Sequence, residues 1–270
     1  MSRILLIETA TEVCSVAIAV DGEVVAMEEE LQSLQHAALL TLQIEACVKT
    51  SGIPLASLDA VAVSRGPGSY TSLRVGASVA KGICYALDKP LIAIDTLLSL
   101  AWASREEMIP STLHPLPSTV YRLPSTVYRP PSTVHPLPST VHRLPSTVFI
   151  PMLDARRQEV WLAVFDERLE ELAPEQPLIA ENDLFDNLIR QVVPRPEEAL
   201  LVISGNGSWK LENGTARENA VFSPVKKCSA QHMKTLAEHF FQNADFQNVA
   251  YFEPFYMKAP NITAPSKGPF

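Results

Sequence analysis

The segment from residue 58 to residue 87 constrains the fold of this 270-residue chain more than any other. Its first part, 58–63, is a short apolar run that predicts a strand. Its last part, 72–87, is rich in small and apolar residues and predicts a helix. Gly66-Pro67-Gly68 forms the turn between them. A strand that turns through glycines into the start of a helix presents backbone N–H groups to an anion.

The residues around this segment predict one α/β lobe. Three antiparallel strands come first, with Asp21-Gly22 as a two-residue turn between the last two. Helices and strands then alternate, so that the expected elements are 3–8, 13–20, 23–28, 35–50, 58–63, 72–87, 91–94 and 97–108. This order is that of a ribonuclease-H-like lobe, an α/β sheet with a hairpin at its edge. We place this first lobe at residues 1–109.

A second, smaller lobe of similar kind is expected at residues 149–270, with the tail after residue 251 as an extended arm. Its expected strands and helices are 149–153, 159–165, 178–180, 181–191, 200–203 and 230–243. Between the lobes, residues 110–148 repeat Pro-Ser-Thr-Val every seven residues, once with Leu for Val. Proline in every copy forbids a coiled coil, so this insert is predicted to be disordered or polyproline-like. A docking arm for a proline-recognising protein is the alternative.

Composition excludes several classes of protein. The formal net charge of −8 disfavours free-standing nucleic-acid binding, because phosphate neutralisation needs Lys and Arg. The four cysteines lie in apolar surroundings without a C-x-x-C pair, which predicts buried, reduced thiols. The histidine spacing predicts no metal site. No apolar run reaches about 18 residues, so we expect no membrane span, no signal peptide and a cytoplasmic location.

Two loops are candidates for holding phosphate. One follows the first strand and the other is the Gly-Pro-Gly turn, and the candidate residues are Glu8, Thr9, Ala10, Thr11, Gly66, Gly68 and Ser69. Small residues let a ligand approach the backbone, and Ser69 or Thr71 can cap the following helix. A tight strand-to-helix turn without a ligand is the alternative. Asp154, Arg156 and Arg157 could form a polar site, but a solvated turn is the favoured interpretation.

The two helices of the first lobe each carry two apolar sides. A helix that covers one face of a sheet needs only one apolar stripe, so the second stripe predicts a partner helix pair. Deeper burial within the chain is the alternative. Helical spacing selects as interface candidates His36, Leu39, Leu42, Tyr70, Leu73, Arg74, Ala77 and Lys81.

The motifs together resemble a known family, the bacterial tRNA threonylcarbamoyladenosine biosynthesis protein TsaB. The resemblance rests on Ile7-Glu8-Thr9-Ala10-Thr11 and the six residues after it, on 65–71 and 73–76, on Asp154-Ala155-Arg156 with Glu159-Val160, and on the tail 253–258. Glu8 stands where many members have Asp, Ser72 stands where Gly is common, and the proline repeat has no counterpart. The resemblance implies a two-lobed fold of the actin-like ATPase superfamily.

The resemblance also implies a function without catalysis by this chain. Such proteins pair through their first two helices with a catalytic paralogue, TsaD, and are joined by a small ATPase, TsaE. The complex transfers threonylcarbamoyl to N6 of adenosine 37 in tRNAs that read codons beginning with A, so tRNA would be met only through the complex. A homodimer is possible. No tightly bound cofactor is expected, although weak contact with ATP, ADP or threonylcarbamoyl-adenylate is possible in the complex. The alternative is an active superfamily enzyme, either an ATP-dependent small-molecule kinase or a metallopeptidase-like hydrolase.

Overall fold

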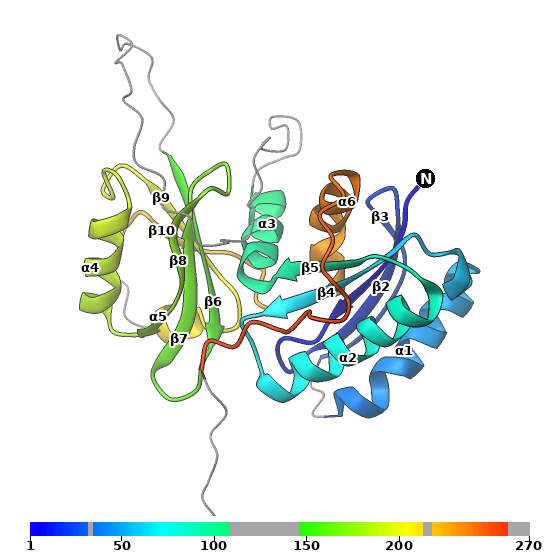
Figure 1. Ribbon diagram of the computed structural model, residues 1–270. Helices are drawn as coiled ribbons and strands as arrows, with labels where there is room; N and C mark the ends of the chain where they lie inside the picture. Colours follow the sequence, from blue (N-terminus) through cyan, green and yellow to red (C-terminus); the bar gives the residue numbers. More distant parts are fainter. Residues whose placement is uncertain (32–34, 109–145, 213–217, 259–270) are drawn as a thin grey trace, which may run out of the picture.

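Two five-stranded sheets with the same strand order form the framework of the molecule (Figure 1). The computed structural model describes residues 1–31, 35–108, 146–212 and 218–258. The first sheet has the order β3-β2-β1-β4-β5, built from β1 (Arg3–Glu8), β2 (Cys14–Val20), β3 (Glu23–Glu30), β4 (Ala60–Gly66) and β5 (Leu91–Asp95). The second has the equivalent order β8-β7-β6-β9-β10, built from β6 (Thr147–Asp154), β7 (Glu159–Phe165), β8 (Glu171–Ile179), β9 (Leu200–Ser204) and β10 (Ala220–Phe222).

Each sheet pairs an antiparallel hairpin edge with parallel strands. In the first sheet β1, β2 and β3 are antiparallel, whereas β4 and β5 run parallel to β1. In the second sheet β6, β7 and β8 repeat the antiparallel part, and β9 and β10 repeat the parallel part. The predicted fold class, an α/β protein with two ribonuclease-H-like lobes, is confirmed.

The helices lie in three layers around the two sheets. α1 (His36–Ser51) and α2 (Tyr70–Leu87) cover the outer face of the first sheet, and α4 (Asn182–Val192) covers the outer face of the second (Figure 1). α3 (Thr96–Met108) and α6 (Lys234–Gln242) lie between the sheets. Helices on both faces bury both sides of the central strands, which explains why those strands read as continuous apolar runs.

Alternate residues of β1 show how the cores are divided. Leu5 and Ile7 belong to the core under α1 and α2, whereas Ile4 and Leu6 belong to the core shared between the two sheets. Successive side chains of a strand point to opposite faces, so one apolar strand serves both cores. The shared core joins the lobes through α3, whose Trp102 packs with Phe149 and Phe165 of the second sheet among its buried residues.

The predicted boundaries of the two lobes stay predictions, but the end of the chain lies partly on the first sheet. Within residues 149–270, which the sequence assigns to the second lobe, α6 contacts β1 and β5 of the first sheet. The strap that follows α6, residues 247–256, also lies on the first lobe: Gln247 bridges to Leu91, and the N–H of Phe255 donates to the carbonyl of Arg65 at 2.6 Å. The second lobe also begins at Thr147 rather than at 149. The predicted limits of the insert stay predictions, since 109–145 is outside the described residues.

Three elements of the second lobe differ from the prediction. β8 extends over Glu171–Ile179 instead of 178–180; its Pro174 and Pro177 are tolerated because β8 is the edge strand. β10 and the short helix α5 (Trp209–Glu212) were not predicted.

All four cysteines are buried and free, as expected. Among the described helices, none has the length and apolar character needed to cross a membrane.

Candidate functional site

Equivalent hairpins of the two lobes carry the polar residues between the lobes. β1 leads into β2 through residues 9–13, and β6 leads into β7 through residues 155–158. The first strand of each sheet ends on a carboxylate, Glu8 in the first lobe and Asp154 in the second. A Mg²⁺-nucleotide in an actin-like ATPase needs a short acidic residue at such a strand end. The environments of these two carboxylates therefore decide what the site can bind.

Glu8 is turned onto its own loop. It is 1% exposed, and its Oε1 accepts a hydrogen bond from the backbone N–H of Ala10 at 2.6 Å. Burial raises the pKa of Glu8 to about 7, although hydrogen bonds from Ala10, Ser64 and Thr9 oppose the rise. The carboxylate oxygen of Glu8 is thus used by the backbone of its own loop, and the side chain is buried away from the space between the lobes.

The Gly-Pro-Gly turn packs directly on the first hairpin. The N–H of Ser69 donates to the carbonyl oxygen of Ala10 at 2.7 Å. A Cβ on Gly68 would lie 2.3 Å from that oxygen, and a Cβ on Gly76 would lie 2.3 Å from the Oγ1 of Thr9. Only glycine permits this approach. The two predicted anion loops therefore contact each other and do not face each other across a cleft.

The other predicted loop residues also serve the packing of the chain. Gly66 has a φ of +106°, and a Cβ there would lie 2.4 Å from the carbonyl oxygen of Phe255 in the strap. The Oγ1 of Thr11 accepts the N–H of Val13 at 3.4 Å. Ser69 is the N-cap residue of α2 but makes no capping hydrogen bond through its side chain, contrary to the prediction.

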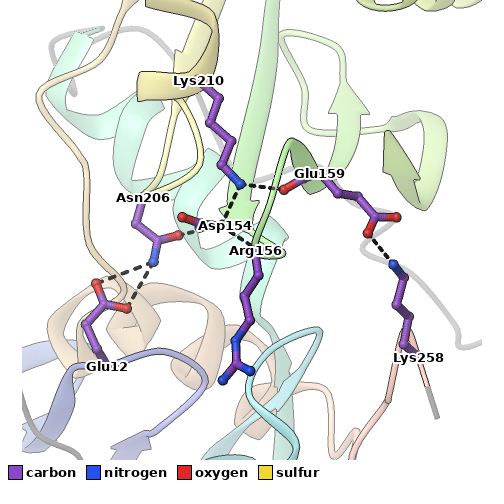
Figure 2. Close-up of polar contacts among 7 residues, drawn as sticks. All are labelled: Glu12, Asp154, Arg156, Glu159, Asn206, Lys210 and Lys258. Atoms are coloured by element: carbon purple, nitrogen blue, oxygen red, sulfur yellow. Dashed lines mark hydrogen bonds and ion pairs between the residues drawn. The ribbon is translucent and has the colours of Figure 1, made fainter. Parts of the chain in front are cut away.

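Asp154 is held by a lysine that the sequence did not single out. The Nζ of Lys210 lies 2.6 Å from Oδ1 of Asp154 and donates to the carbonyl oxygen of Glu159 at 2.8 Å (Figure 2). The side chain of Lys210 is 1% exposed. Oδ1 also accepts the N–H of Arg156 at 2.7 Å. Arg156 and Arg157 have φ values of +67° and +50°, so both backbones lie in the left-handed region, and the N–H of Glu159 closes the turn by donating to the carbonyl oxygen of Arg156 at 3.1 Å.

The favoured interpretation of residues 154–157 as a solvated turn is thus only half correct. The turn exists and both arginines are exposed, but Asp154 belongs to a polar cluster that contains a buried ammonium group. In Figure 2 the guanidinium of Arg156 points away from Asp154 toward the loops of the first lobe.

Polar bridges connect the lobes on two sides of this region. Asn206 accepts the N–H of Asp154 with its Oδ1 at 3.0 Å and donates to Glu12 of the first hairpin at 3.1 Å (Figure 2). On β4, Arg65 lies 2.8 Å from Asp95 and 2.7 Å from Glu175 of the second sheet. Burial raises the pKa of Asp95 to about 8, against the opposing effect of Arg65. The lobes are therefore joined by direct contacts between residues.

The residues at this site do not fit a magnesium nucleotide. Glu8 is buried and bonded to its own loop, Asp154 is neutralised by Lys210, and the N–H of Ser69 is used within the chain. In the described ranges, no group of three His, Cys, Asp or Glu side chains is placed to hold a metal ion.

The outer surface of α1 and α2 is the second candidate site. Leu42 is 60% exposed and Tyr85 is 87% exposed, although both lie on helices that cover a sheet. A Cβ on Gly82 of α2 would meet no atom within 4 Å. Between the exposed positions, Leu39 and Val79 are half-buried against their own core. This face, defined by Leu39, Leu42, Val79, Gly82 and Tyr85, is called the helix-pair face below.

Several predicted interface residues lie elsewhere. His36, Leu73 and Ala77 are buried, and a ring nitrogen of His36 lies 3.2 Å from the carbonyl oxygen of Val13. These three residues belong to the stripe that packs on the sheet, because each helix has two apolar stripes and spacing alone does not say which one is covered. Leu42 is exposed and Leu39 is half-buried on the outer stripe, and their part in an interface stays a prediction.

The polar candidates face the strap. Lys81 donates to the carbonyl oxygens of Ala250 and Phe252, at 3.1 and 2.9 Å. Tyr70 packs against Tyr256 with 4.5 Å between ring centroids and a tilt of 46° between the rings, and Arg74 lies over the ring of Tyr70. These side chains fix the strap along α2, so they border the helix-pair face rather than form it.

Comparison with known proteins agrees with this arrangement. The family model described as "TsaD: tRNA N6-adenosine threonylcarbamoyltransferase" matches residues 26–119. The TsaB protein of Escherichia coli is 40% identical over 99 residues, which are 37% of this chain and 42% of that protein. The TsaB protein of Haemophilus influenzae is 39% identical over 103 residues, 38% of this chain and 43% of that protein. Part of this chain is similar to TsaB. The matched part spans less than half the length of either TsaB protein.

Solved structures extend the likeness to the whole fold. A Pseudomonas aeruginosa protein described as similar to peptidase YeaZ superposes with a TM-score of 0.70 at 22% identity, and the match covers 96% of this chain and 100% of the other. YeaZ from the same organism gives a TM-score of 0.68, also at 22% identity, over 95% of this chain and 100% of the other. At this identity the likeness shows the fold alone, and that fold is the two-lobed one described above.

The residues that sequence reasoning missed are Lys210 and Asn206. Both follow β9, in the segment Ser204-Gly205-Asn206-Gly207 and the short helix after it. The signal that could have found them is the repeated strand order. Because the two sheets share one strand order, the hairpin at residues 154–159 is equivalent to the hairpin at residues 8–14. The loop after residues 200–204 is then equivalent to the Gly-Pro-Gly loop after β4. It should therefore pack on the second hairpin, as the Gly-Pro-Gly loop packs on the first hairpin.

Proposed function

We propose that this chain is a non-catalytic scaffold and activating subunit of the complex that transfers threonylcarbamoyl to N6 of adenosine 37 in tRNA. The observation that carries the proposal is the similarity to TsaB, joined to a candidate nucleotide site whose carboxylates are satisfied within the chain. A protein of this fold that lacks the residues for its own chemistry contributes by binding to a partner that has them.

The partner proposed for the helix-pair face is a catalytic paralogue with the same lobe. The chain is similar both to TsaB and to the tRNA N6-adenosine threonylcarbamoyltransferase of Solidesulfovibrio magneticus, which is 47% identical over 68 residues, 25% of this chain and 18% of that protein. Exposed Leu42 and Tyr85 supply the kind of apolar and aromatic anchors that carry binding energy in protein interfaces. A small ATPase of the TsaE kind would join the pair, and tRNA would be met through the complex. A homodimer through the same face is the competing association.

The test is co-purification with the transferase paralogue from the same genome. We expect Leu42→Arg and Gly82→Arg each to weaken association by about tenfold or more, because they place a charge on the contact surface while the fold survives. The matched control is Leu184→Arg on α4, a 39% exposed leucine on the opposite side of the molecule. Ala77→Arg is unsuitable, because Ala77 is buried and the variant would unfold the lobe. Unchanged co-elution of both face variants would refute the proposed surface.

The alternative function, an active kinase, would require ATP and Mg²⁺ to bind between the lobes. Calorimetry with ATP and Mg²⁺ on the isolated chain should give no micromolar binding, because neither Glu8 nor Asp154 offers a free carboxylate. Micromolar binding that is lost in Glu8→Gln would favour the kinase and count against the scaffold.

A further inference from the structure

We infer that the ammonium group of Lys210 is a built-in cation, which supplies to Asp154 the positive charge that this strand end would otherwise take from a divalent metal ion. The inference does not depend on the proposed function. It begins from the position of Asp154, which ends the first strand of the second sheet as Glu8 ends the first strand of the first sheet.

The contacts of Lys210 are those of a site built around a cation. Its Nζ is bound by a carboxylate oxygen from the end of β6, at 2.6 Å, and by a backbone carbonyl oxygen from the start of β7, at 2.8 Å. Oxygen atoms of these two kinds are the ligands that Mg²⁺ and Ca²⁺ prefer. Here both are occupied by an ammonium group whose side chain is 1% exposed.

Lys210 reaches this place because of the loop before it. Gly205 has a φ of +85°, and a Cβ on Gly207 would lie 2.7 Å from the carbonyl carbon of Leu153. The N–H of Gly207 donates to the carbonyl oxygen of Met152 at 3.0 Å. The loop therefore lies directly against β6, and the first turn of α5 directs Lys210 under the hairpin.

The consequence is a second lobe that is assembled without metal. Lys210 joins both ends of the 155–158 turn, Asp154 holds the N–H of Arg156, and Asn206 connects the same hairpin to Glu12 of the first lobe (Figure 2). Lys210 is 1% exposed and Asp154 is 33% exposed, so water solvates part of the charge left when Lys210 is removed. Removing Lys210 should still destabilise this lobe more than removing an exposed lysine would, because a buried side chain and its ion pair are lost together.

The decisive experiment is thermal unfolding of the full chain with and without millimolar MgCl₂, against NaCl of equal ionic strength. The wild-type Tm should not respond to Mg²⁺. Lys210→Ala should lower the Tm by roughly 6–15 °C, and Mg²⁺ should restore at least half of that loss. Asp154→Asn combined with Lys210→Ala should show no restoration. Lys226→Ala is the matched control, since Lys226 pairs with Glu212 nearby but is 39% exposed.

Three results would overturn the inference. In the first, Mg²⁺ raises the Tm of the wild-type chain, or the wild-type chain binds Mn²⁺ in an EPR titration. In the second, Lys210→Ala is no less stable than Lys226→Ala. In the third, MgCl₂ raises the Tm of Lys210→Ala no more than NaCl does. Should Lys210→Ala fail to fold, its refolding yield with and without Mg²⁺ replaces the Tm. Lys210→Arg, which keeps the charge, should be indifferent to Mg²⁺ in every assay.

Discussion

The two lobes share one strand order but treat the same strand-end carboxylate in opposite ways. In the first lobe Glu8 is buried, accepts a hydrogen bond from its own loop and has a pKa raised to about 7. In the second lobe Asp154 is one-third exposed and is paired with the ammonium of Lys210. A carboxylate can be satisfied by proton retention or by a neighbouring cation, and this chain uses one solution in each lobe.

The helices after the fourth strands differ as well. α2 has 18 residues and α5 has four, although both follow a glycine loop at the end of the fourth strand. The long helix pairs with α1 and leaves Leu42 and Tyr85 exposed, whereas the described part of α5 places Lys210 against the hairpin of its own lobe. The comparison teaches that equivalent positions of one architecture can leave apolar side chains exposed in one lobe and hold a buried polar contact in the other.

The largest expected effect comes from Arg65, which joins the two lobes. Because burial raises the pKa of Asp95 to about 8, Asp95 is largely protonated near neutral pH, and Arg65→Met leaves the mostly buried carboxylate of Glu175 without its cation. We expect a loss of about 3–5 kcal/mol in the free energy of unfolding. Urea unfolding measures it, with the exposed Arg74→Met as control. A loss below that of the control would show that the lobes do not depend on this bridge.

The pH dependence of stability that Glu8 causes tests the contrast between Glu8 and Asp154. Its folded pKa of about 7 lies above the ordinary value of 4.5, so the folded state binds the extra proton and loses stability as the pH rises from about 4.5 to 7. The shift corresponds to a loss on the order of 3 kcal/mol. Glu8→Gln should remove this pH dependence. Compared with the wild-type chain, the variant should therefore gain free energy of unfolding between pH 5 and pH 8. Urea titrations at both pH values test this, and an unchanged slope in the variant would contradict the assignment.

The glycine loops provide a third test. Gly68→Ala would force a Cβ to 2.3 Å from the carbonyl oxygen of Ala10, and Gly207→Ala would force one to 2.7 Å from Leu153. We expect losses of about 2–3 kcal/mol for Gly68→Ala and somewhat less for Gly207→Ala. Chemical denaturation gives both values. If only one variant is destabilised, the two loops do not play equivalent parts.

The smallest expected effect has the opposite sign. Gly82 lies in α2 with open space around its Cβ position, so Gly82→Ala should stabilise the isolated chain by about 0.5–1 kcal/mol through helix propensity. A calorimetric Tm measures the gain. Destabilisation would mean that something on the isolated chain covers this part of the helix-pair face.

The sequence was sufficient for the local elements of the first lobe and for the α/β class of both lobes. Strands and turns in the first lobe are predicted by short local patterns: apolar runs of strand length, the Asp21-Gly22 turn and the Gly-Pro-Gly turn. The elements of the structure agree with these predictions within a few residues. Most of β8 was not predicted, because edge strands tolerate proline and polar residues. These residues weaken the alternation of apolar and polar side chains from which a strand is predicted. The repeat at 110–148 was visible in the sequence but lies largely outside the described residues.

What the sequence determined by itself is therefore the periodicity: which residues form strands and helices, and that two α/β lobes follow one another. What only the tertiary structure decided is which of two apolar stripes each helix buries, that the strap returns to the first lobe, and that Lys210 reaches Asp154 across 56 positions of the chain. Periodicity arises from neighbouring residues, whereas burial and charge pairing depend on segments that meet only when the sheets pack together. For this reason His36 and Ala77 looked like surface residues in the sequence, and the ion pair of the second hairpin could not be seen there at all.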